Sequence, residues 1–84
     1  MRPISIEMLK EIVAASLGVT PAEITNELSL DEAPSWDSIA HIAIFTELES
    51  RLDQTFTASQ IMETRDFEAL CTLVGLAPSE AVDD

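Results

Sequence analysis

Residues 35–52 read SWDSIAHIAIFTELESRL, and this stretch predicts the central helix of the fold. Asp37 and Ser38 are residue types that favour a helix start, and the helix should run from there to about Leu52. Apolar residues recur after them at helical spacing, at Ile39, Ile42, Phe45, Leu48 and Leu52. Other alanine and isoleucine residues extend the apolar surface around much of the circumference. The helix should therefore lie centrally in the fold or present an apolar patch to a partner.

Two further helices are predicted, one on each side of this stretch. Residues 5–17 carry one apolar stripe, with Ser5 suited to cap the start and Gly18 suited to a left-handed end. Residues 65–74 carry a second stripe, and Gly75 should end that helix. These patterns predict an all-α fold, a small bundle of three main helices.

Shorter elements connect the helices. Residues 20–23 read TPAE, which favours a single helical turn, and residues 57–62 predict another short helix. A long loop, residues 25–36, separates the first two main helices. Leu28 and Leu30 lie at alternating positions in it and should hold it on the core. A connection of this length without regular structure tends to be functional.

Size and charge limit the possible functions. A chain of 84 residues indicates one domain, too small for a deep catalytic cleft. Its 16 acidic and 4 basic residues give a net charge of −12, which disfavours nucleic acid and anionic membranes as partners. It suits partners with basic docking patches, although acidity can also serve solubility alone. One cysteine, no membrane-length apolar run and no secretory signal predict a cytoplasmic protein, which we expect to be a monomer.

Residues for catalysis are sparse. His41 is the only histidine and Cys71 the only cysteine, so we expect no metal site, and Cys71 should simply pack in its helix. His41 follows Ser38 by one helical turn, which leaves a small Ser–His hydrolase as one hypothesis, although no third member is evident. Asp37-Ser38 can equally be nothing but a helix cap, with Trp36 packing ahead of it as a hydrophobic staple.

The order of elements resembles the acyl carrier protein family, and the likeness runs from about Glu7 to Gly75. Asp37-Ser38-Ile39 stands where that family has Asp-Ser-Leu at the start of its second helix. The other matching positions are Leu17-Gly18-Val19 at the end of the first helix, Ile24, Leu28 and Leu30 in the loop, Glu47-Leu48-Glu49 and Leu52, Phe56, and residues 64–67 before the last helix.

The resemblance implies a free-standing acyl carrier protein and not an enzyme. Ser38 would carry a 4′-phosphopantetheine arm derived from coenzyme A, with acyl or aminoacyl groups held on it as thioesters, and Asp37 would position the attachment site. Its partners would be a phosphopantetheinyl transferase, which brings its own Mg²⁺, a loading enzyme, and a downstream transferase or synthase. Residues 1–76 would form the carrier domain and residues 77–84 a disordered acidic tail. A helical interaction module without a prosthetic group is the alternative.

Several positions depart from the pattern of fatty-acid carriers. Ser35 replaces the usual glycine, and the first turns of the second helix lack that family's acidic face. We therefore expect a specialised biosynthetic pathway. The predicted docking surface is apolar near Ser38, with charge further along: Trp36, Ile39, Ala40, Ala43 and Glu47. Aromatic side chains should fill the core, so we expect short or polar cargo, or cargo left exposed: Phe45, Phe56, Phe67 and Trp36.

Overall fold

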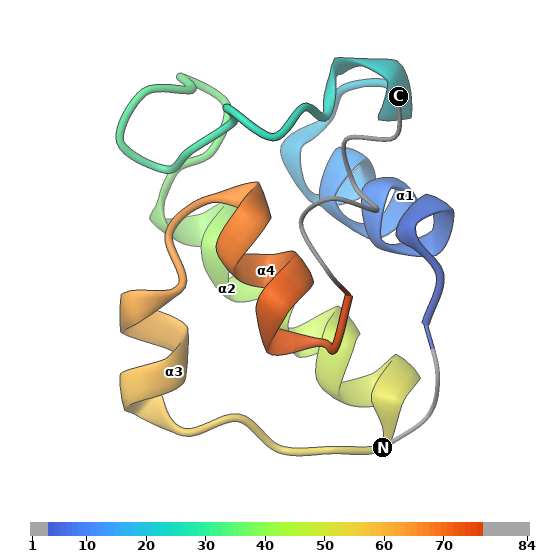
Figure 1. Ribbon diagram of the computed structural model, residues 1–84. Coiled ribbons are helices and arrows are strands. Elements are labelled where there is room, and N and C mark those ends of the chain that lie inside the picture. The colour runs from blue at the N-terminus through green and yellow to red at the C-terminus, as the bar shows by residue number, and fades with distance from the viewer. Residues whose placement is uncertain (1–3, 77–84) are drawn as a thin grey trace.

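Three main helices and two short ones make up the computed structural model, which describes residues 4–76 (Figure 1). In chain order they are α1 (Ile6–Leu17), the 3₁₀ turn η1 (Pro21–Glu23), α2 (Ser38–Leu52), α3 (Ala58–Glu63) and α4 (Phe67–Leu73). In Figure 1, α1 lies at the upper right, α3 at the left edge, and α4 in front of α2. The predicted all-α bundle with a long loop between its first two main helices is confirmed. The acidic tail predicted for residues 77–84 lies outside the described residues.

Local capping signals place most of the helix ends. The Ser5 hydroxyl accepts a hydrogen bond from the Met8 amide at 3.1 Å, and Gly18 ends α1 in the left-handed region at φ 76°. Thr57 and Gln60 cap α3 reciprocally, because each side chain accepts from the other's backbone amide. The predicted ends of α1 and the predicted short helix at residues 57–62 are therefore confirmed.

The last helix is shorter than predicted. We expected it to begin at Arg65, but Asp66 has an extended backbone and its carboxylate accepts from the Ala69 amide at 2.7 Å. That cap makes Phe67 the first helical residue. At the other end Gly75 takes a left-handed backbone at φ 91°, as its place after the stripe predicted.

The core lies between α1, α2 and α4. Leu9 and Val13 of α1, Ile44 and Leu48 of α2, and Leu70 of α4 have no exposed surface. Burial of an aliphatic side chain contributes about 1.5–3 kcal/mol, so this shared interior is the main force that assembles the helices. No helix within residues 4–76 is long and apolar enough to cross a membrane.

The long loop is fastened to the segment that leads into α4. The Leu30 amide donates to the Arg65 carbonyl at 2.8 Å, and the Phe67 amide donates to the Leu28 carbonyl at 3.0 Å. These two bonds flank an isolated antiparallel bridge between Ser29 and Asp66. Leu28 and Leu30 are partly buried against the core, as their alternation predicted. The loop therefore has a defined path into the start of α2.

Candidate functional site

Ser38 is the first residue of α2, and its side chain is exposed. The cap is supplied by the residue before it, because Asp37 Oδ1 accepts from the Ala40 amide at 2.9 Å. Asp37 therefore accounts for the helix start without help from the serine. A helix cap explains Asp37 but gives no reason for a serine at the next position, and the Ser38 hydroxyl stays open to a modifying enzyme.

The start of α2 is held in place by a buried polar network. The Trp36 indole is 1% exposed, and its Nε1–H donates to His41 Nδ1 at 3.1 Å. With Nδ1 accepting, the neutral ring carries its proton on Nε2, which donates to the Ile61 carbonyl at 2.7 Å. Trp36 precedes the cap and His41 lies four residues after it, so the pair occupies the positions of a hydrophobic staple. The network joins the loop, α2 and α3.

This network removes the hydrolase hypothesis. Both ring nitrogens of His41 are used in hydrogen bonds, and neither is free to take a proton from Ser38. Within residues 4–76 there is also no group of three histidine, cysteine, aspartate or glutamate side chains placed to hold a metal ion. Cys71 is fully buried, and desolvation followed by the charge of Glu68 raises the pKa of its thiol to about 11.

The predicted docking residues separate into two groups. Trp36 and Ala40 are only 1% and 5% exposed, so including them in a docking surface was wrong. Trp36 is drawn inward by its bond to His41 and by the packing of its ring. Ile39 is 82% exposed and Ala43 is also exposed, whereas Glu47 is partly exposed and paired with Arg51 at 2.7 Å.

Two apolar residues beside Ser38 were missed by the sequence reasoning. Ile42 is 56% exposed and Met62 of α3 is 70% exposed. Ile42 and Ile39 were assigned to the apolar stripe of α2, but the buried stripe is offset from them and contains Ala40, His41, Ile44, Phe45, Leu48 and Leu52. An available sign was that α2 is apolar on more than one side, so that some of its isoleucines had to remain outside the core.

Two surface hollows meet at Ser38. The polar hollow is bordered by the loop, the start of α2 and the residue before Asp66, and its lining includes Leu30, Asp31, Glu32, Asp37, Ser38 and Arg65. The apolar hollow lies between α2 and α3, and its lining includes Leu30, Ser38, His41, Ile42, Ile61 and Met62. Arg65 borders this second hollow as well. A group attached to Ser38 would thus have polar surface on one side and apolar surface on the other.

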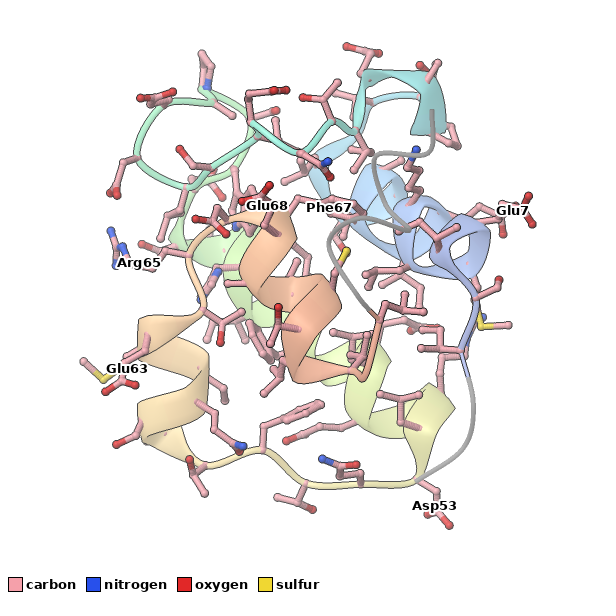
Figure 2. The ribbon with its side chains drawn as sticks, in the orientation of Figure 1. Glu7, Asp53, Glu63, Arg65, Phe67 and Glu68 are labelled. Carbon is pink, nitrogen blue, oxygen red and sulfur yellow. The ribbon has the colours of Figure 1, made fainter. Side chains whose placement is uncertain are left out.

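Two residues in the lining of the polar hollow, Asp31 and Arg65, form an ion pair. Arg65 Nη2 lies 2.6 Å from Asp31 Oδ1, and both side chains are about half exposed or more. The hydrogen bond and the charge of Arg65 lower the pKa of Asp31, and Asp31 in turn raises the pKa of Arg65. Figure 2 shows Arg65 at the outer edge of the molecule, on the connection between α3 and α4.

The residues around Ser38 suit a phosphodiester. The Ala40 amide is used by Asp37, but the amides of Ser38 and Ile39 have no acceptor within the helix. These amides and the positive end of the helix dipole favour an anion at this position. Arg65 adds a cation on the border of the same hollow. An exposed hydroxyl, unused amides and a nearby guanidinium together fit a group joined to Ser38 through phosphate.

Comparison with known protein families shows what this chain is similar to. Residues 7–74 match the family described as "Phosphopantetheine attachment site". The matched residues run from the first turn of α1 to just past the end of α4. Among curated proteins, none matches this chain.

Proposed function

The chain belongs to the family of proteins with a phosphopantetheine attachment site, and from this premise we propose that Ser38 carries the arm. Members of this family are carriers and not enzymes, and the attachment site implies a 4′-phosphopantetheine group. The observation that carries the proposal is the exposed Ser38 hydroxyl at the first position of α2, next to a cap that Asp37 supplies. On this proposal, the protein presents acyl or aminoacyl thioesters to the enzymes of a specialised biosynthetic pathway.

The attachment step uses groups that this chain presents. A phosphopantetheinyl transferase would bring coenzyme A and Mg²⁺ to the exposed serine. A bond forms between Ser38 Oγ and the phosphorus of the pantetheine phosphate, and the pyrophosphate bond of coenzyme A breaks. Adenosine 3′,5′-bisphosphate leaves, and the serine proton passes to a base on the transferase. The arm, once attached, supplies a terminal thiol that holds cargo as a thioester.

Asp37 is proposed to position the attachment site. Its carboxylate bond to the Ala40 amide fixes the first turn of α2, and its backbone carbonyl accepts from the His41 amide at 2.9 Å. Both bonds hold the backbone of the turn that contains Ser38. The Trp36–His41–Ile61 network beneath the same turn restrains it from the core side. A transferase therefore meets a preorganised serine.

The cargo is proposed to be short or polar, or to stay exposed on the arm. Four large aromatic residues fill the interior, and none is more than 4% exposed: Trp36, Phe45, Phe56 and Phe67. Three of these rings and His41 form a row in edge or tilted contact, with Phe45 and Phe56 centroids 5.6 Å apart. This packing occupies volume that a long acyl chain would need. A long chain enclosed between α2 and α4 would contradict this part of the proposal.

Partner enzymes are proposed to dock on an apolar surface around the arm. Ile39, Ile42 and Met62 are its exposed large side chains, and Ala43 lies beside them on α2. Further along α2, Glu47 and its partner Arg51 add charge at the edge. Exposed apolar area next to an attachment site favours client enzymes with a matching apolar contact surface.

The test is enzymatic modification followed by intact mass. The full chain is incubated with coenzyme A, Mg²⁺ and a broad-specificity phosphopantetheinyl transferase. We expect wild type to gain the mass of one phosphopantetheine and Ser38→Ala to gain none. Ser50→Ala is the matched control, because Ser50 is also exposed on α2 but lies near its other end. No gain in folded wild type would favour an interaction module. An undiminished gain in Ser38→Ala would show that another residue is the attachment site.

A further inference from the structure

The backbone at Arg65 is held against the loop that leads to Ser38. The Arg65 carbonyl accepts from the Leu30 amide at 2.8 Å, and the Phe67 amide is bonded to Leu28. These two hydrogen bonds therefore hold the backbone around Arg65 beside the loop, although the Arg65 side chain is half exposed. That side chain borders both hollows that Ser38 borders.

The charges around the polar hollow single out Arg65. Asp31, Glu32 and Asp37 line this hollow, and Arg65 is the only cation in its lining among the described residues. The whole chain carries a net charge of −12. Addition of a phosphodiester to Ser38 places one more negative charge in this neighbourhood, where like charges repel it. A counter-ion at the hollow would offset that repulsion.

The Arg65 guanidinium has N–H donors that could bind such an anion. A guanidinium carries five N–H donors, and its fork matches the geometry of phosphate oxygens. One donor, on Nη2, is engaged by Asp31 Oδ1 at 2.6 Å. The Asp31 side chain is 67% exposed, and exposed ion pairs of this kind contribute little net stability. Transfer of Arg65 from a solvated carboxylate to a phosphodiester therefore costs little.

We propose that Arg65 is the counter-ion of the arm's phosphodiester, and that Asp31 holds the guanidinium at the polar hollow until the arm is attached. The inference rests on the proposed modification of Ser38. It assigns a positioning role to a residue outside the Asp37-Ser38-Ile39 segment. With its phosphate held by Arg65 at the polar hollow, the arm would have less freedom of orientation at Ser38.

The first measurement uses wild-type protein before and after modification, with intact mass confirming the arm. The side-chain Nε–Hε resonances of Arg65 and Arg51 are followed by ¹H–¹⁵N NMR. We expect the Arg65 resonance to shift on modification and the Arg51 resonance to stay in place. Arg51 is the internal control because its side chain is as exposed as that of Arg65, at 49%, and is also paired with a carboxylate, that of Glu47 on α2. Equal shifts, or no shift at Arg65, would overturn the proposal.

The second measurement uses variants and the ³¹P resonance of the attached phosphodiester. Arg65→Gln should move this resonance toward its position in the same modified protein unfolded in urea, Arg65→Lys should move it less, and Arg51→Gln should leave it unchanged. A ³¹P resonance identical in wild type and Arg65→Gln would overturn the proposal. Failure of any variant to gain mass concerns the attachment itself and is seen before the ³¹P spectrum is recorded. If Arg65→Gln does not fold, the wild-type Nε–Hε comparison decides.

Discussion

The starts of α2 and α4 are built alike but expose opposite residues. Each begins after an extended aspartate whose Oδ1 accepts from the amide three residues on, at 2.9 Å for Asp37 and 2.7 Å for Asp66. At α2 the residue before the cap is buried and the one after it is exposed, Trp36 and Ser38. At α4 the order is reversed, because Arg65 is exposed and Phe67 is fully buried.

The reversal shows which residue at a helix start is left accessible for modification. The cap satisfies backbone amides in both helices and is the same in both. What differs is which flanking residue serves as the anchor in the core. Trp36 anchors α2 from outside the helix, so the first helical residue is free for modification. Phe67 anchors α4 from inside, so Arg65 remains outside, on the border of the hollows at Ser38.

The largest expected effect separates the two first helical residues. Phe67→Ala should reduce the free energy of unfolding by about 3–5 kcal/mol, because it removes a fully buried ring. Ser38→Ala should change it by no more than about 0.5 kcal/mol, since an exposed side chain with no capping role is removed. Urea unfolding followed by circular dichroism measures both. Similar losses in the two variants would show that Ser38 has a structural role.

A second difference concerns the two thiols of the modified protein. The arm thiol on α2 would be exposed, whereas burial raises the pKa of Cys71 on α4 from 9.0 to about 11. Because the thiolate is the nucleophile, iodoacetamide at pH 8 should label the arm at least about 100-fold faster than Cys71. Peptide mass spectrometry locates the label, and unmodified protein is the control. Comparable labelling of Cys71 in folded protein would contradict its inert packing.

The same raised pKa has a consequence for stability at high pH. Folded protein keeps the Cys71 proton that the unfolded chain loses, so this contribution to stability is fully present below pH 9.0 and is lost as pH rises through about 11. The free energy of unfolding of wild type should therefore fall across this range more steeply than that of Cys71→Ala. Parallel pH profiles for the two proteins would show that Cys71 does not contribute.

The smallest expected effect compares the caps themselves. Asp37→Ala and Asp66→Ala should each reduce the free energy of unfolding by about 1 kcal/mol, because each loses one side-chain bond to a helix amide. Only Asp37→Ala should also slow attachment of phosphopantetheine, which a time course of intact mass would reveal. Asn in place of Asp at each position preserves the cap and is the control. Equal slowing by Asp66→Ala would mean that general loosening, and not Asp37, controls the rate.

Local signals in the sequence predict the helices and their ends well. Ser5, Thr57 and Gly18 act through neighbours within a few residues, so their roles can be inferred without knowing the fold. The apolar stripe predicts a start for α4 two residues before the observed one, because the cap at Asp66 sets the first helical residue and the stripe does not. A capping aspartate directly before a buried aromatic was the better sign.

Contacts between distant segments could not be predicted in this way. Periodicity left open which side of α2 faces inward, and packing against α1 and α4 leaves Ile39 and Ile42 outside. The bond from Trp36 to His41 depends on an inward turn of the loop. Arg65 and Asp31 are 34 residues apart and meet only because the loop is paired with the segment before α4. The exposed position of Ser38 at the start of α2 could be predicted, since the signals that set it are local.

The buried indole beside the proposed attachment site gives this protein a natural optical probe. Trp36 is the only tryptophan in the chain, so all tryptophan fluorescence arises two residues before Ser38. Its Nε1–H is bonded to His41, and its ring lies against the imidazole with centroids 6.0 Å apart. Emission should be blue-shifted while the indole is buried and should move to longer wavelength if binding of a client enzyme exposes the ring to water. Stopped-flow fluorescence could then time each docking event on unlabelled protein.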